Sequence, residues 1–104
     1  MSSVLLGAAP VAASDAPFVA VCFSVQAAAE PGVMPRVLEL FAKRGLVPQK
    51  WQSAVSGTLL TIDVQIGGLG RETVDYIARC MRQIAGVDAV LTSERRASQE
   101  LNRG

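Results

Sequence analysis

The residues best placed to do chemistry form a short turn, Glu30-Pro31-Gly32, that leads into a helical pattern. The first backbone N–H groups of a helix have no partner within it, and the helix dipole adds positive potential there. We therefore expect the N–H groups of Gly32, Val33 and Met34 to be free to hold a carboxylate. Gly32 carries no side chain, so a ligand can approach the backbone closely. The alternative is a plain turn that binds nothing.

Other candidate groups indicate neither catalysis nor metal binding. The chain has no histidine, which excludes histidine acid–base catalysis and histidine metal sites. Cys22 and Cys80 are interpreted as two small apolar side chains; a disulfide between them is the open alternative, and two thiols are too few for a zinc or iron–sulfur site. Gly67-Gly68-Leu69-Gly70 lacks the spacing of a phosphate-binding loop and predicts a flexible link. We expect no cofactor, and an enzyme is the least favoured class because no nucleophile has a convergent acid–base partner.

Length and composition predict one domain. Half of the 104 residues are hydrophobic, which is enough for one core without metals or disulfides. The net charge of +1 gives no reason to expect nucleic acid as a partner, and no apolar run is long enough to span a membrane. Residues 1–16 carry no Lys or Arg of the kind that opens a secretory signal. We expect flexible tails at residues 1–16 and 97–104, an ordered domain at residues 17–96, and a cytoplasmic location.

Hydrophobic periodicity predicts a βαββαβ order of elements. Strands are expected at residues 17–26, 46–55, 58–66 and 87–95, and helices at residues 31–44 and 71–85. This order is the α+β, ferredoxin-like arrangement, a four-stranded antiparallel sheet with two helices on one face. Right-handed crossovers place the last strand beside the first and the first beside the third. The second strand then lies at an edge, where Pro48 is tolerated.

The alternation within each element predicts which side chains face the core. The expected core residues are Val19, Val21, Phe23, Val25, Val33, Val37, Phe41, Leu60, Ile62, Val64, Ile66, Val74, Ile77, Ala78, Met81 and Ile84, with Val47, Trp51 and Val55 from the less regular second strand. In the last strand Val87, Ala89 and Leu91 alternate with Asp88, Val90 and Thr92. No helix remains to cover the other face of the sheet, so we expect this domain to associate with another.

Two motifs carry a resemblance to a known family. They are Pro31-Gly32-Val33-Met34-Pro35-Arg36-Val37 and the Phe-x-x-Arg-Gly of Phe41 to Gly45. Together they resemble the opening of an ACT domain, and most closely that of acetolactate synthase small (regulatory) subunits. The later stretch from Val74 to Val90 is similar to the second helix and last strand of the family. The resemblance covers residues 18–94.

The resemblance implies a non-catalytic regulatory domain and a homodimer, formed through sheet edges or helices, that binds a small effector such as an amino acid. The turn of one copy would supply Ala29, Glu30, Pro31, Gly32, Val33 and Met34, and a strand of the other copy would supply Gln49, Lys50 and Trp51. It also implies a large catalytic partner subunit from branched-chain amino acid biosynthesis.

One position departs from the family pattern. The family often has Asn or Asp where Ala29 stands, and that side chain helps to hold the amino group of the ligand. Ala29 cannot form a hydrogen bond through its side chain. A keto acid or another acid is therefore an alternative ligand. The alternative function is an interaction domain that dimerises and docks a partner without any ligand.

Overall fold

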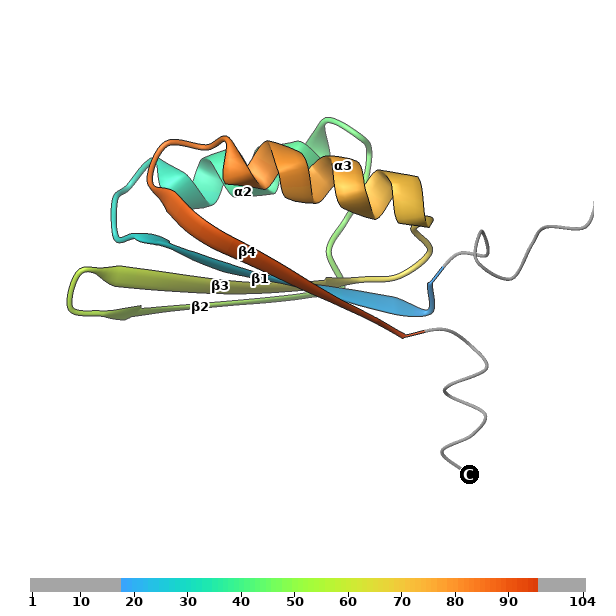
Figure 1. Cartoon of the computed structure of the whole chain (residues 1–104), viewed down its shortest axis with the longest axis horizontal. Helices are drawn as coiled ribbons and strands as arrows, with labels where there is room; N and C mark the ends of the chain where they lie inside the picture. Colours follow the sequence, from blue (N-terminus) through green and yellow to red (C-terminus); the bar gives the residue numbers. More distant parts are fainter. Residues whose placement is uncertain (1–17, 96–104) are drawn as a thin grey trace, which may run out of the picture.

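The computed structural model describes residues 18–95, which form four strands and two helices. The elements are β1 (Ala20–Ala28), α2 (Val33–Ala42), β2 (Lys50–Ser56), β3 (Leu59–Ile66), α3 (Arg71–Arg82) and β4 (Val87–Arg95). Both helices lie on one face of an antiparallel sheet, so the predicted ferredoxin-like α+β fold is confirmed (Figure 1). Neither helix is long and apolar enough to cross a membrane. The tails predicted at residues 1–16 and 97–104 lie outside the described residues.

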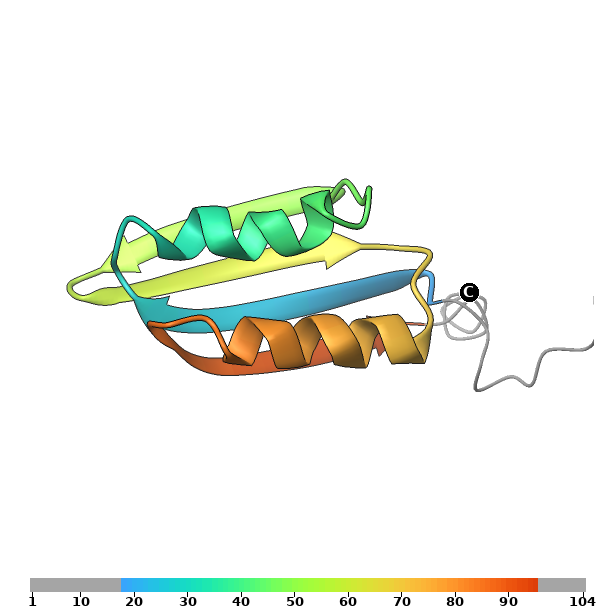
Figure 2. The same ribbon diagram turned by 90° about the horizontal axis from the view of Figure 1, so that it is seen from above.

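The strand order is β2-β3-β1-β4, as the crossover argument predicts. Seen from above the helix layer, α2 lies over the β2–β3 side of the sheet and α3 over the β1–β4 side (Figure 2). The central strand β1 places Phe23 between Val64 of β3 and Thr92 of β4. At Gly57 the chain turns from β2 into β3 with a φ of 62°, a left-handed conformation that glycine adopts without strain.

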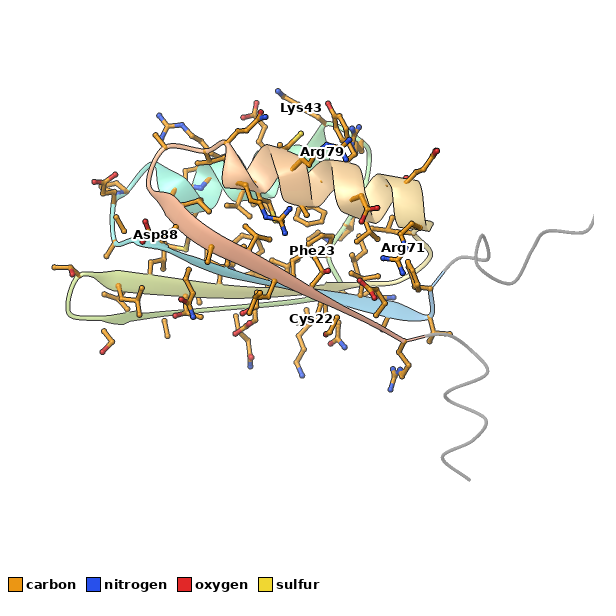
Figure 3. The ribbon with its side chains drawn as sticks, viewed as in Figure 1. Cys22, Phe23, Lys43, Arg71, Arg79 and Asp88 are labelled. Carbon is orange, nitrogen blue, oxygen red and sulfur yellow. The ribbon has the colours of Figure 1, made fainter. Side chains whose placement is uncertain are left out.

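A single core fills the space between the sheet and the helices. Val21, Phe23 and Val25 of β1 are fully buried, as are Val33, Val37 and Phe41 of α2. The rings of Phe23 and Phe41 pack edge to face with centroids 5.7 Å apart. In Figure 3 Phe23 lies between the two layers, whereas its neighbour Cys22 lies on the opposite side of the sheet. The alternation predicted for β1 and β3 is therefore confirmed, with Val19 only half-buried.

Two valines predicted to face the core lie in solvent. Val47 precedes β2 and is 81% exposed. Val55 is paired with Leu60 on the helix-facing side of the sheet, yet it is 62% exposed. The reason is that the β2–β3 hairpin extends beyond the start of α2, so no helix covers its tip (Figure 2). Trp51 does pack partly against the core, on the same face as Val64.

A register shift decides which side chains of β4 face the core. The pairing of β4 with β1 shifts between Gln26 and Ala27, as in a β-bulge. As a result Val90 lies opposite Val25 and Val87 opposite Ala27, although the two valines are three residues apart. Val90 is buried in the core, and Leu91 is 69% exposed on the other side. We call that side, which carries Cys22, Ser24, Asp63 and Leu91, the open face.

Candidate functional site

The turn predicted to bind a ligand lies between β1 and α2, at one end of the sheet. Two loops hold it in place. The N–H of Ala28 donates a hydrogen bond to the carbonyl oxygen of Gly86 at 2.8 Å, and the N–H of Ala29 donates to the carbonyl oxygen of Thr58 at 3.0 Å. The turn is therefore fixed between the β2–β3 hairpin and the α3–β4 loop.

The N-terminus of α2 has one fewer free N–H group than the sequence suggests. Gly32 is the N-cap residue and has a φ of −80°. No side chain caps α2, and the first turn of the helix contains no acidic residue. The N–H of Val33 donates to the carbonyl oxygen of Glu30 at 3.2 Å, so the expectation of a free N–H at Val33 is wrong. The chain closes a tight turn there before the helix begins. The side chain of Val33 is buried, and that of Met34 is half-buried against the core.

An arginine that the sequence reasoning did not select lies over Gly32. A Cβ atom built on Gly32 would lie 2.6 Å from Nη1 of Arg36. Within residues 18–95 this guanidinium forms no ion pair. A cation at a helix N-terminus is unfavourable because the dipole is positive there, and an anion bound beside it would relieve that repulsion. The only signal in the sequence was the four-residue spacing from Gly32 to Arg36, which is one helical turn.

The carboxylate of Glu30 lies beside the α3–β4 loop. Its Oε1 would be 3.4 Å from a Cβ atom built on Gly86, and the side chain is exposed. Pro31, which follows Glu30, is also exposed. The turn thus combines a guanidinium, a carboxylate and a glycine without a side chain. Such a set can hold the carboxylate and the ammonium of a zwitterion, or a carboxylate alone.

The second half of the predicted site, Gln49, Lys50 and Trp51, lies at the opposite end of the sheet. Lys50 pairs with Gln65, which pairs with Cys22, six residues before Ala28 along β1. Six residues of strand span about 20 Å, so one chain does not bring the two halves together. Lys50 points to the open face, and Trp51 is half-buried. A site that uses both halves requires a second copy, and β2 is an edge strand of this sheet.

Comparison with known proteins identifies the domain. The family model for ACT-like domains matches residues 14–99. The chain belongs to this family. Members of the ACT class are generally regulatory, ligand-binding modules that typically lack catalytic activity. No curated protein sequence matches the chain.

Solved structures show the same fold at low sequence identity. The ACT domain from the GTP pyrophosphokinase of Chlorobium tepidum matches with a TM-score of 0.65 and 12% identity, over 74% of this chain and 99% of that one. An uncharacterized protein of Thermotoga maritima matches with 0.60 and 14%, over 72% and 94%. The C-terminal domain of the MgtC protein from Mycobacterium tuberculosis matches with 0.62 and 13%, over 86% and 98%. These likenesses support the ACT-like fold alone.

The two cysteines of this ACT-like domain do not form a disulfide with each other. Cys22 and Cys80 are both free and both half-buried. Burial, and then the nearby Asp63 carboxylate, raise the pKa of the Cys22 thiol, which keeps it protonated at neutral pH and makes it a poor nucleophile. Residues 18–95 contain no cluster of acidic or sulfur side chains that could hold a metal ion.

Proposed function

We propose that the chain is a non-catalytic regulatory ACT domain that binds a small carboxylic acid, an amino acid or a related acid, at the interface of a homodimer. The observation that carries this proposal is the charged β1–α2 turn. Arg36 lies over Gly32 at an uncapped helix N-terminus, and the carboxylate of Glu30, two residues before Gly32, lies beside Gly86. The ligand carboxylate would bind Arg36 and the free amides of the turn.

Glu30 offers a replacement for the side chain that Ala29 lacks. A carboxylate attracts an ammonium more strongly than a neutral amide does. Free amino acids therefore stay within the proposed ligand class. Keto acids would use Arg36 without Glu30. The two classes can be separated by changing Glu30 alone.

The separation of the two halves of the site supports the proposed homodimer. Gln49, Lys50 and Trp51 of one copy would face the turn of the other, with the β2 edges beside each other. An edge strand presents unpaired N–H and C=O groups that a second strand can satisfy. A ligand held by both copies binds more tightly to one arrangement of the pair than to another, and this difference in affinity is what regulates an attached enzyme.

The resemblance of the first two motifs to acetolactate synthase small subunits indicates the large catalytic subunit of that enzyme as the partner. The domain would then act in the cytoplasm on the large catalytic subunit of that enzyme, in branched-chain amino acid biosynthesis. A direct test is whether the purified chain binds that subunit and makes its activity sensitive to the effector.

Ligand binding is tested by thermal unfolding with branched-chain, aromatic and small amino acids and with their keto acids. A ligand at 100 times its dissociation constant adds about 2.7 kcal/mol to the free energy of unfolding. We expect one class to raise the melting temperature. In Gly32→Val the new side chain displaces the Arg36 guanidinium and fills the approach to the backbone, so the shift should disappear while the domain stays folded, since a φ of −80° suits valine.

Arg36→Gln should weaken the same ligand about 10- to 100-fold, the usual value of a charge-assisted hydrogen bond. Lys43→Gln removes a cation from the other end of α2 and is the matched control, expected to leave affinity unchanged. Glu30→Gln should weaken an amino acid but not a keto acid. If Gly32→Val and Arg36→Gln bind the ligand as the unmodified chain does, the ligand lies elsewhere and the proposed site is wrong.

A ligand-free interaction domain is the second candidate. Two observations favour it: Ala29 offers no polar side chain, and the N–H of Val33 already donates to Glu30. Under this candidate no acid in the panel changes the melting temperature, while the chain still forms a stable dimer and binds a partner protein. A clear thermal shift from any one acid would exclude it.

A further inference from the structure

The outer surface of α3 carries a stripe of charged and aromatic side chains that the proposed function does not use. Glu72, Asp75, Tyr76 and Arg79 recur at helical spacing and are all exposed, on the opposite side of α3 from the buried Val74, Ile77 and Met81. Arg79 lies in the helix layer, on the other side of the sheet from Cys22 (Figure 3). This surface is therefore separate from the open face.

Two arginines converge on the single tyrosine of this stripe. The guanidinium of Arg44, just after α2, lies 4.3 Å from the centroid of the Tyr76 ring, and that of Arg79 lies 5.7 Å from it. Tyr76 is 45% exposed in spite of these contacts. In the part of the chain that the structure describes, neither guanidinium forms an ion pair with a carboxylate. Tyrosine and arginine are the side chains most enriched where proteins bind each other.

The same side chains line a groove beside the tyrosine. Leu46 and Leu69 line it together with the charged side chains of Arg44, Glu72, Asp75 and Arg79. Neither carboxylate forms an ion pair within residues 18–95. A second, narrower groove between the helices shares Arg44 and Tyr76 with the first. The surface thus holds two cations and two anions that form no ion pair among residues 18–95.

The charge pattern selects the occupant. A small anion or an acidic protein segment would satisfy Arg44 and Arg79 but would be repelled by Glu72 and Asp75. A basic partner would be attracted by Glu72 and Asp75 but repelled by Arg44 and Arg79. A two-fold interface places the same patch on both partners, so a patch that carries both signs of charge can complement itself if the axis brings opposite charges together. We propose that the α3 stripe, Glu72, Asp75, Tyr76 and Arg79 together with Arg44, is a self-association surface whose occupant is the same stripe of a second copy.

The spacing along α3 allows this arrangement. If two α3 helices cross antiparallel near Tyr76, Arg79 lies about 4.5 Å along the axis from the crossing point, at a rise of 1.5 Å per residue. Asp75 and Glu72 of the other copy then lie about 1.5 and 6 Å along the same direction, on either side of Arg79. The two Tyr76 rings meet at the centre with the Arg44 guanidinium groups beside them. Arg79, Asp75 and Glu72 of each copy thereby gain partners of opposite sign, and Arg44 stays against the tyrosine rings.

This interface is independent of the proposed ligand site. The turn between β1 and α2 lies at the other end of α2 from Arg44, and the β2 edge is a different surface. If the chain also pairs through β2, the α3 contact would join two pairs into an assembly of four chains. If it does not, the α3 contact alone would give a dimer. Loss of the α3 contact would therefore leave the β2 contact intact, and the reverse also holds.

Mixing two oppositely charged variants tests the proposal. Arg44→Glu with Arg79→Glu makes the patch wholly acidic, and Glu72→Arg with Asp75→Arg makes it wholly basic. Light scattering or sedimentation of the full chain should show each variant alone with half the mass of the unmodified assembly. Self-association of each variant should be weakened about tenfold or more, because like charges now face each other. An equimolar mixture of the two should recover the mass, and it should lose it again in high salt.

The control variant reverses a charge outside the patch and away from the β2 edge, at Asp88→Lys, and should keep the mass of the unmodified chain. Circular dichroism must show that all variants are folded; all the altered side chains are exposed. Tyr76→Ala offers a variant without charge reversal and should also weaken the contact. If the acidic and basic variants keep the mass of the unmodified chain, or if their mixture contains no complex of the two, the proposal is overturned. Neither result depends on whether an effector binds the β1–α2 turn.

Discussion

The chemistry of the β1–α2 turn depends on the missing side chain of Gly32 as well as on the charged side chains of Glu30 and Arg36. Gly32 leaves space that the Arg36 guanidinium occupies. A larger residue would move the arginine, which is flexible, without forcing the backbone. An effector that binds here has to displace or recruit that guanidinium. Under the proposed function, the specificity for that effector would be set by Arg36, one helical turn beyond Gly32.

Cys22 provides a pH prediction at the scale of one side chain. Burial and the Asp63 carboxylate both raise the pKa of its thiol. In a Cys80→Ser background, alkylation of Cys22 by iodoacetamide should reach half of its maximal rate at a higher pH than alkylation of a free cysteine peptide. Asp63→Asn removes the smaller of the two causes and should lower that pH slightly. Asp88→Asn, on β4, is the control and should change nothing.

The raised pKa of Cys22 also determines how the free energy of unfolding changes with pH. The folded thiol keeps its proton to higher pH than the unfolded thiol does, so the unfolded state binds fewer protons as pH rises above the ordinary cysteine pKa. The contribution of Cys22 to the free energy of unfolding is therefore complete below that pKa and falls as pH rises through the folded value. A stability that rose with pH in this window, beyond that of a Cys22→Ser variant, would contradict the assignment.

The sequence predicted part of the candidate site. The Pro31-Gly32 turn before an apolar helical pattern located the helix N-terminus, because proline and glycine restrict where a helix can begin. It did not reveal Arg36, because a side chain folding back over Gly32 depends on its rotamer. It also did not reveal that Val33 donates to Glu30, because the tightness of a turn is set by the loops that hold it. Whether the turn binds a ligand stays a prediction.

At the scale of elements, the α3–β4 loop supports the turn. Gly86 has a φ of 97°, and its carbonyl oxygen accepts the N–H of Ala28. A Cβ atom there would lie 3.2 Å from Cγ2 of the buried Val33 and 3.4 Å from Oε1 of Glu30. The glycine therefore permits both the left-handed backbone and the close packing of the loop on α2.

Three glycine variants separate these two contributions. Gly86→Ala should lower the free energy of unfolding by about 1–3 kcal/mol, from the backbone conformation and the contact with Val33 together. Gly68→Ala also has a positive φ but meets nothing within 4 Å, so it should show the backbone cost alone. Gly70→Ala has a φ of −87° and open space, but Gly70 is the N-cap of α3, where alanine is less favourable than glycine, so it should cost less than about 1 kcal/mol. Urea denaturation measures all three, and equal losses at Gly68 and Gly86 would contradict a role for packing.

The periodicity of the sequence predicted all six elements but misplaced the side chains at their margins. Strict alternation cannot anticipate the register shift at Gln26, which sets Val87 and Val90 on one face of β4 and Leu91 on the other. Nor does it reveal how far α2 reaches along the sheet, which decides that Val55 stays in solvent. Both outcomes depend on contacts between elements distant in sequence, and local patterns do not contain them.

For the whole molecule, one helix layer on one sheet means one core. Phe41 joins α2 to Phe23 at its centre, whereas Val55 lies on the uncovered tip of the hairpin. Phe41→Ala should cost about 3–5 kcal/mol of the free energy of unfolding, a large share of the 5–15 kcal/mol of a typical domain. Val55→Ala should change it by less than about 0.5 kcal/mol. Comparable losses in the two variants, measured by denaturant midpoints, would mean that the hairpin tip is covered in solution.

The adjacency of β1 and β4 in this sheet also governs how the domain would respond to mechanical force. The N–H of Val19 donates to the carbonyl oxygen of Arg95 at 2.8 Å, so the two ends of the described chain leave the sheet side by side. Their hydrogen bonds lie perpendicular to the strands. Tension applied through both ends would load these bonds one after another, from Val19 inwards, and peel β4 from β1 at low force. A domain attached at either end would therefore pull on the same pair of strands, and the turn at the far end of β1 would be the last part to feel it.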